Sequence, residues 1–189
     1  PEHLSLINDL WNYLPYDYRY NTLLKRYEEK LENWDCSKEG FEGIRAQDIL
    51  PLLTIHFNFE FFYAFGGIID VFVGREFGHH FNLQDSWDLN FIDYVANLNN
   101  KLLLKKYIKP TQLLAYLTIK QPTEQIYVNN LSPFECIRNP NDEPKEYTLN
   151  ELLNEKIIET LPPTVDLNKK SKFFLNKDYS NKKFNPGNI

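Results

Sequence analysis

The succession of predicted elements favours an α/β fold. Apolar residues recur at helical spacing in Arg45–His56 and again in Trp87–Lys106. Each helical pattern is followed by a short run with the length and the aromatic or aliphatic content of a strand, first Asn58–Phe65 and then Gln112–Ile119. Alternation of helices and strands along a chain is typical of α/β architecture, so we expect a sheet with helices packed against it.

The N-terminal segment predicts two helices. In Glu2–Leu14 the apolar residues recur every three or four positions, and Pro15 then favours a helix end. Thr22–Leu31 is a second, more exposed helix candidate, because its acidic and basic residues lie close enough to pair along one face. We therefore expect a pair of helices before the first strand.

The central elements carry their own start and stop signals. Pro51 lies inside the predicted helix Arg45–His56, so we expect a kink or a late start there. Ser86 is the expected N-cap of Trp87–Lys106, and Pro110 ends that helix. The second strand then begins at once.

Beyond Pro122 the character of the sequence changes. Residues 139–144 have the composition of a loop, and Leu149–Leu161 predicts a modest amphipathic helix that two prolines end. About the last 25 residues are rich in Asn and Lys, which predicts an irregular tail. We accordingly divide the chain into a region 1–120 and a C-terminal extension 121–189.

The overall composition excludes several classes of protein. The 189 residues carry a formal net charge of −5, which disfavours a general nucleic-acid surface. No apolar run approaches the roughly 20 residues of a membrane span, and no signal peptide is visible. The two cysteines, Cys36 and Cys136, form no metal-type pair. We expect a cytoplasmic protein that binds a small molecule rather than a nucleic acid or a membrane.

Two charged segments that contain glycine flank the first predicted strand, and topology brings them together. A helix that leads into a parallel strand starts at the carboxyl edge of the sheet, where the loop Gly66–His80 also leaves the strand. Ligands bind at that edge in open α/β sheets. The candidate substrate-binding residues are Asp35, Glu39, Glu42, Arg45, Asp70 and Arg75.

Two adjacent histidines in the second segment are the candidate catalytic residues. A histidine near neutral pH can act as a general base, so His79 or His80 could remove a proton from a substrate. The alternatives are a hydrogen-bonded structural role and a metal site completed by a carboxylate. Because no H-x-H or H-x-x-x-H spacing is present, we predict no metal.

The substrate-binding candidates have structural alternatives as well. Glu39 and Glu42 would favour the positive end of a helix dipole. Arg45 could form an ion pair with Asp48 or with Asp70. Asp70 lies inside an apolar run, which favours a carboxylate that caps a turn over one that acts as a base. The sequence leaves these alternatives open.

The same two segments resemble signatures of a group of bacterial class I S-adenosylmethionine-dependent methyltransferases. The resemblance is carried by Glu32–Leu53, reading E-N-W-D-C-S-K-E-G-F-E-G-I-R-A-Q-D-I-L-P-L-L, and by Phe65–Phe81, reading F-G-G-I-I-D-V-F-V-G-R-E-F-G-H-H-F. F-I-D at Phe91–Asp93 and I-K-P-T-Q at Ile108–Gln112 fit the same pattern. The opening P-E-H-L is similar to the stretch after the fifth strand in that group, so the resemblance covers about residues 1–120.

The resemblance implies that Asn58–Phe65 and Gln112–Ile119 are strands six and seven of a Rossmann-like methyltransferase sheet, the seventh antiparallel. It further implies S-adenosylmethionine as the cofactor and a small polar metabolite, such as a sugar, as the substrate. The glycine loop and the acidic residue that hold the cofactor in such enzymes have no counterpart in this sequence. We therefore expect the carboxyl-terminal, substrate-side part of the enzyme, inactive in isolation. The alternative is a non-catalytic binding module derived from such an enzyme.

Overall fold

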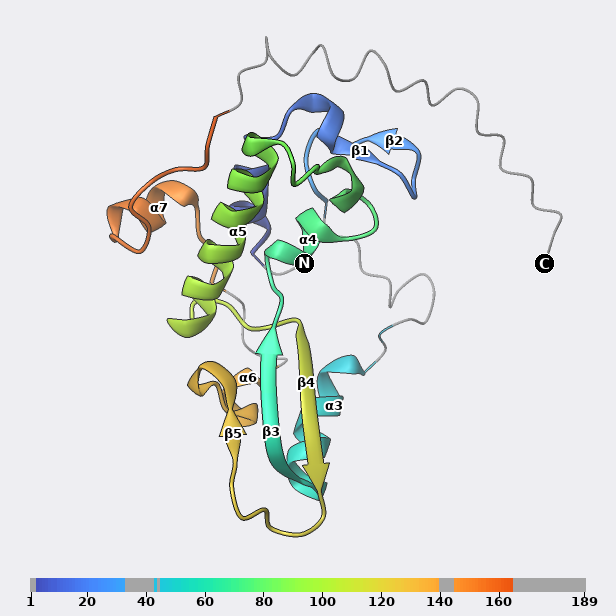
Figure 1. Cartoon of the computed structure of the whole chain (residues 1–189), viewed down its shortest axis with the longest axis vertical. Helices are drawn as coiled ribbons and strands as arrows, with labels where there is room; N and C mark the ends of the chain where they lie inside the picture. The colour runs from blue at the N-terminus through green and yellow to red at the C-terminus, as the bar shows by residue number, and fades with distance from the viewer. Residues whose placement is uncertain (1–2, 33–42, 44, 140–144, 165–189) are drawn as a thin grey trace, which may run out of the picture.

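The computed structural model describes residues 3–32, 43, 45–139 and 145–164, which form a mixed α/β fold (Figure 1). The central strand β3 (Asn58–Phe65) lies between β4 (Gln112–Thr118) and the short β5 (Ile126–Tyr127). The α/β prediction is confirmed at this level, and both predicted strands end within one residue of the expected position. The predicted tail, 165–189, lies outside the described residues.

Strands β3 and β4 pair antiparallel over their whole length. Asn58 lies opposite Thr118 and Phe65 lies opposite Gln112, with one irregularity between Phe59 and Phe61. Strand β5 pairs parallel with β3 on the other side. Because side chains alternate along a strand, one face of the pair buries its residues in the core while the other face carries partly exposed aromatic rings.

The helices form two groups (Figure 1). One group lies beyond the carboxyl end of β3 and consists of α1 (Leu4–Trp11), α4 (Ile69–Val73), α5 (Ser86–Leu104) and α7 (Leu149–Asn154). The other lies beside the sheet and consists of α3 (Ala46–His56) and α6 (Pro133–Cys136). Single turns of 3₁₀ helix, η1 (Tyr16–Arg19), η2 (Gly78–His80) and η3 (Val128–Asn130), connect these elements.

Aromatic side chains fill the core between the helices of the first group. Trp11 is fully buried and meets Phe77 edge to face at 4.8 Å between ring centroids. Phe91 of α5 is also fully buried and stacks on Phe81 and Trp87. Burial of these rings removes a large apolar area from water, which is the main stabilising contribution to this layer.

Helices α1 and α7 cap each other, although about 140 residues separate them in the sequence. The Glu146 carboxylate accepts hydrogen bonds from the backbone N–H groups of Leu4 (3.2 Å) and Ser5 (2.9 Å). In return, the Asp9 carboxylate accepts one from the N–H of Leu149 (2.8 Å). First-turn N–H groups have no partner inside a helix, so Glu146, just before α7, caps α1, and Asp9 of α1 caps α7. The described part of the C-terminal extension thus packs directly on the N-terminal helix.

The predicted helix Thr22–Leu31 is wrong. This region contains a two-stranded hairpin, in which β1 (Tyr20–Asn21) pairs antiparallel with β2 (Arg26–Tyr27). The side-chain oxygen of Asn21 accepts hydrogen bonds from the backbone N–H groups of Leu23 and Leu24, at 3.0 Å each. An asparagine that bonds the following backbone in this way stabilises a turn in competition with a helix.

Two predicted helix boundaries also differ from the structure. The N-cap of α5 is Asp85 rather than Ser86. The Asp85 carboxylate accepts hydrogen bonds from the backbone N–H groups of Trp87 (2.9 Å) and Asp88 (3.3 Å) in the first turn. Helix α7 ends at Asn154 instead of reaching Leu161, since Lys156 adopts a left-handed backbone with φ 56°.

A two-glycine turn carries the chain from the sheet into the helical layer. Gly66 and Gly67 have φ angles of +77° and +129°, which side chains rarely adopt. The buried Asn99 of α5 holds the turn: its Nδ2 donates to the carbonyl of Gly66 (3.1 Å), and its Oδ1 accepts from the N–H of Ile69 (3.4 Å). A Cβ atom on Gly67 would approach Asn99 Oδ1 to 2.6 Å. The glycines and Asn99 are therefore required together.

We predict that Asn99→Ala lowers the free energy of unfolding by about 2–4 kcal/mol, because two buried backbone groups lose their partner. The matched control is Asn100→Ala, which removes the same side chain from the exposed face of the same helix and should change stability by less than ~0.5 kcal/mol. Urea denaturation measures both values. Equal effects of the two substitutions would contradict the assigned role of Asn99.

Candidate functional site

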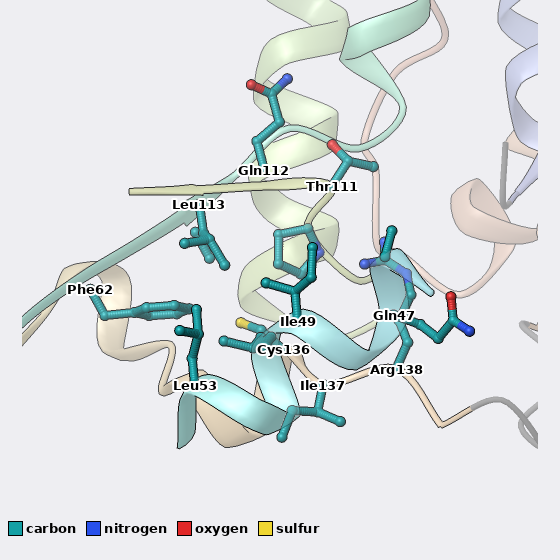
Figure 2. A pocket seen from close by; sticks show the side chains of 14 residues that line it. Gln47, Ile49, Leu53, Phe62, Thr111, Gln112, Leu113, Cys136, Ile137 and Arg138 are labelled. Carbon is teal, nitrogen blue, oxygen red and sulfur yellow. The ribbon is translucent and has the colours of Figure 1, made fainter. Parts of the chain in front are cut away.

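A pocket of about 320 Å³ lies where α3 begins, β3 ends and β4 starts (Figure 2). One wall is the face of α3 that is turned to the sheet, a second is the start of β4, and a third is formed by α6 and the residues after it. The lining residues are Ala46, Gln47, Ile49, Leu50, Leu53, Phe62, Ala64, Pro110, Thr111, Gln112, Leu113, Cys136, Ile137 and Arg138.

The pocket is apolar at one end and polar at the other. Figure 2 shows Leu53, Phe62 and Leu113 at the apolar end, and Gln47 with Arg138 at the opposite end. The Arg138 guanidinium is held by a hydrogen bond from Nη2 to the carbonyl oxygen of Lys109 (3.3 Å). Among the described residues that line the pocket, Arg138 is the only one with a formal charge.

Asp70 lies at the same edge as the pocket and caps a turn. Its carboxylate accepts hydrogen bonds from the N–H of Gly67 (3.1 Å), from Gln112 Nε2 (3.2 Å) and from the hydroxyl of Thr111. The turn-capping alternative is therefore the one found in the structure. Because Thr111 and Gln112 also line the pocket, Asp70 fixes the start of β4 beside it.

Arg45 pairs with a neighbour on its own helix. Its Nε lies 2.6 Å from the Asp48 carboxylate, and 76% of its side chain is exposed. Such an exposed pair contributes little to stability. Arg45 immediately precedes the pocket-lining Ala46, so it lies near the mouth of the pocket. The other candidates of this segment, Asp35, Glu39 and Glu42, lie outside the described residues.

Arg75 and His80 contact the hairpin β1–β2, and none of Arg75, His79 and His80 lines the pocket. The backbone carbonyl of Arg75 accepts a hydrogen bond from the Thr22 hydroxyl (3.1 Å). The Nε2 of His80 lies 2.7 Å from the carbonyl oxygen of Tyr20 and therefore donates to it. His79 is exposed, with its ring 4.0 Å from that of His80.

His80 also borders a buried polar cluster. The carboxylate of Asp88, only 1% exposed, accepts hydrogen bonds from the Tyr18 hydroxyl at 2.7 and 2.9 Å and from the N–H of Asn82 at 2.7 Å. Burial, followed by the hydrogen bond to Asp88, raises the pKa of Tyr18 far above its usual value. The Tyr18 hydroxyl therefore keeps its proton and donates it in the hydrogen bond to Asp88. His80 donates a hydrogen bond to the Tyr20 carbonyl and its ring lies 6.0 Å from that of Tyr18, so its contacts are those of a structural histidine. His79 is the more exposed of the two.

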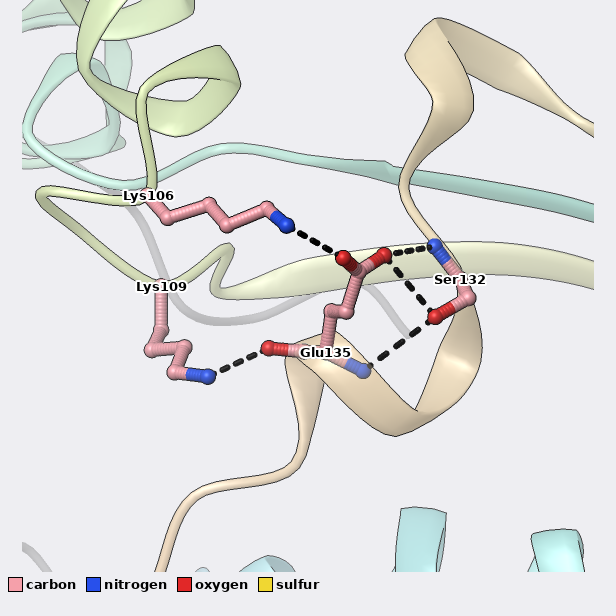
Figure 3. Close-up of polar contacts among 4 residues, drawn as sticks. All are labelled: Lys106, Lys109, Ser132 and Glu135. Atoms are coloured by element: carbon pink, nitrogen blue, oxygen red, sulfur yellow. Dashed lines mark hydrogen bonds and ion pairs between the residues drawn. The ribbon is translucent and has the colours of Figure 1, made fainter.

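The α6 wall of the pocket is fixed by one carboxylate (Figure 3). Glu135 completes a capping box with Ser132 and forms an ion pair with Lys106 Nζ at 2.5 Å. Lys109 donates in addition to the backbone carbonyl of Glu135. The hydrogen bond from Lys106, and then those from Ser132, lower the pKa of Glu135 to about 2. These contacts tie α6 to the segment between α5 and β4.

Sequence reasoning missed most of this pocket. Cys136 and Arg138 lie in the extension 121–189, which the family resemblance does not cover and for which the sequence analysis proposed no site residue. Capping is the one signal that was available there, because Ser132 and Glu135 have the spacing of a capping box. It predicts the start of α6 but not what that helix packs against.

Neither a metal cluster nor a membrane-spanning segment is found in the part of the chain that the structure describes. There, no group of three or more His, Cys, Asp and Glu side chains is placed to hold a metal ion. None of the helices in those ranges has both the length and the apolar character needed to cross a bilayer. Comparison of the chain with protein-family models, with curated proteins and with solved structures found no match.

We predict that Glu135→Gln lowers the melting temperature at pH 7, and that the difference from the native chain shrinks at acid pH. The folded-state pKa of Glu135, about 2, lies below the ordinary value of 4.5. Its stabilisation is therefore complete above pH 4.5 and is lost as the pH falls toward 2. Melting curves between pH 7 and pH 3 measure the effect, with the exposed loop residue Glu124→Gln as the control. A difference that does not depend on pH would contradict the assignment.

Proposed function

We propose that this chain is the substrate-side part of a bacterial S-adenosylmethionine-dependent methyltransferase that acts on a small polar metabolite such as a sugar. The observation that carries the proposal is the open edge of β4, because a strand of this kind belongs in the interior of a larger sheet. The motif resemblance of residues 32–53 and 65–81 supplies the family. In that family, β3 and β4 correspond to the sixth strand and the antiparallel seventh strand.

The side of β4 that faces away from β3 pairs with no strand among the described residues. The strand reads Q-L-L-A-Y-L-T, with no charge and no proline to discourage pairing. Natural edge strands are usually protected by charges, prolines or bulges. An unprotected strand of seven residues therefore supports a further strand beside it in the complete protein.

The uncovered face of the same pair supports this argument. Leu114 and Tyr116 are 54% and 65% exposed, and Tyr116 meets the ring of Phe61 at 5.6 Å. Ile119, just beyond the strand, is 83% exposed. Leu114 and Tyr116 lie on one face of β4, and large apolar side chains exposed together on a folded chain support a contact with another surface. The cofactor half of a methyltransferase sheet would supply that contact.

A non-catalytic binding module derived from such an enzyme is the second candidate function. Its support is the same aromatic surface, which could bind a partner protein or a carbohydrate. The two candidates differ in the state of the isolated chain. A sheet fragment should associate through β4, whereas an independent module should be a stable monomer.

We predict that the isolated chain self-associates, and that the double substitution Leu114→Lys with Tyr116→Lys weakens the association at least about tenfold by placing charge on the apolar face. Sedimentation velocity over a range of concentrations measures this. Leu23→Lys with Leu24→Lys is the matched control, because these leucines are 54% and 58% exposed on the turn of the other hairpin. A native chain that is monomeric throughout would overturn the sheet-fragment proposal and favour the module.

We predict that His79→Ala in the complete enzyme lowers kcat about 10²–10⁴-fold, the usual contribution of a general base, while the affinity for S-adenosylmethionine hardly changes. For His80 the suitable substitution is glutamine, which retains a donor for the Tyr20 carbonyl. The control is His56→Ala at the exposed end of α3. Calorimetry gives the cofactor affinity and radiolabelled methyl transfer gives the turnover. Equal losses of turnover and cofactor affinity would sink the assignment.

A further inference from the structure

We infer that the tyrosine platform, formed by Tyr16 of η1 with Tyr20 and Tyr27 of the hairpin β1–β2, binds the apolar face of a pyranose sugar of the β-glucoside type. The hairpin lies at the end of the molecule away from the three-stranded sheet (Figure 1). The inference therefore depends neither on the open edge of β4 nor on the methyltransferase proposal, and each can fail without the other.

The three rings form one compact cluster with a single flat face open to solvent. The ring of Tyr27 lies 4.5 Å from that of Tyr16, with 13° between the planes, and 5.1 Å from that of Tyr20. Tyr20 and Tyr27 are directly opposite residues of the strand pair, so their side chains share one face of the hairpin. One face of the Tyr16 ring is stacked on Tyr27, yet Tyr16 is 58% exposed. The other face of its ring is therefore turned to solvent.

Hydrogen bonds from the core hold the platform in place. The buried Trp11 donates from Nε1 to the backbone carbonyl of Glu28 (3.1 Å), the residue after Tyr27. His80 donates to the backbone carbonyl of Tyr20 (2.7 Å) and so joins the other strand to η2. A surface that is already ordered loses little conformational entropy when it binds a ligand.

A flat tyrosine face is complementary to one side of a pyranose ring. In a β-glucoside, the C–H groups at carbons 1, 3 and 5 point to the same side of the ring, while the hydroxyl groups lie around its rim. Covering this C–H side with an aromatic ring removes apolar surface from water, and the negative face of the ring attracts the hydrogens. The hydroxyl groups keep their access to water or to polar side chains.

Asp17 supplies a polar group at the rim of the platform. It directly follows Tyr16 and is exposed. Burial, and then the charge of Asp17, raise the pKa of Tyr27, which indicates that the carboxylate lies near the Tyr27 hydroxyl. A carboxylate has two oxygens that accept charge-assisted hydrogen bonds, so it can bind neighbouring hydroxyl groups of a sugar.

The same rings disfavour a bound cation. An aromatic cage for a quaternary ammonium group places its rings around the cation. Here the rings contact one another, at 4.5 and 5.1 Å between centroids, which leaves no space among them. The open face of Tyr16 favours a flat, neutral ligand instead.

Saturation-transfer difference NMR on the full chain tests the inference, with methyl β-D-glucopyranoside as the probe. Glucitol, which has the hydroxyl groups of a sugar but no ring, is the matched control ligand, and tetramethylammonium tests the cage. We expect the hydrogens on carbons 1, 3 and 5 of the glucoside to receive at least about twice the saturation of those on carbons 2 and 4, because they face Tyr16. Glucitol should bind at least about tenfold more weakly.

Substitutions then locate the site. Tyr16→Ala should weaken glucoside binding at least about tenfold, whereas Tyr16→Phe, which keeps the flat ring, should change it less than about threefold. Phe134→Ala is the matched control, because it removes a 67% exposed ring from α6, and it should leave binding unchanged. Absence of saturation transfer to the glucoside would overturn the inference. Equal binding of glucitol, tighter binding of tetramethylammonium, or glucoside binding that Tyr16→Ala leaves unchanged would do the same.

Discussion

The junction at Gly66 and Gly67 connects the two parts of this structure. There the central strand leaves the sheet and enters the helical layer, with a backbone conformation that only glycine adopts readily. Asn99, buried in the longest helix, satisfies the polar groups that this conformation exposes. If the junction moved, the start of β4 would move with it, because Asp70 links the turn to Thr111 and Gln112.

The same junction explains why the pocket exists. Helix α3 precedes β3, and the Gly66–Gly67 turn leads the chain away from the sheet after β3. The residues that follow β3 therefore do not cover the end of the strand. Helix α6, fixed by Glu135, closes the third side of this space. The result is a concave apolar surface at the carboxyl end of a strand, which is where α/β folds commonly bind ligands.

The sheet itself has two different edges. The short β5 pairs with the middle of β3, whereas the other edge of β4 pairs with no strand in the part of the chain that the structure describes. The outer face of the pair carries exposed apolar side chains. Leaving apolar surface in water is unfavourable, and this constraint is the basis of both functions proposed above. The proposed methyltransferase sheet and the alternative binding module each explain the exposed apolar side chains. They differ in whether a further strand pairs its backbone with β4.

The sequence by itself determined the type and the order of α3, β3, α5 and β4, because periodicity and the proline signals are local properties. It did not predict the short helix α4 and the turn η2, which lie in the segment Gly66–His80 that the sequence analysis treats as a loop. Only the tertiary structure decided which polar groups meet. Asn21 turned a predicted helix into a hairpin, Glu146 capped a helix from the far end of the chain, and Arg138 came to lie beside α3. Such contacts join residues that are distant in sequence, and spacing along the chain carries no information about them. For that reason the sequence grouped His80 with Asp70, whereas packing placed His80 against Tyr20.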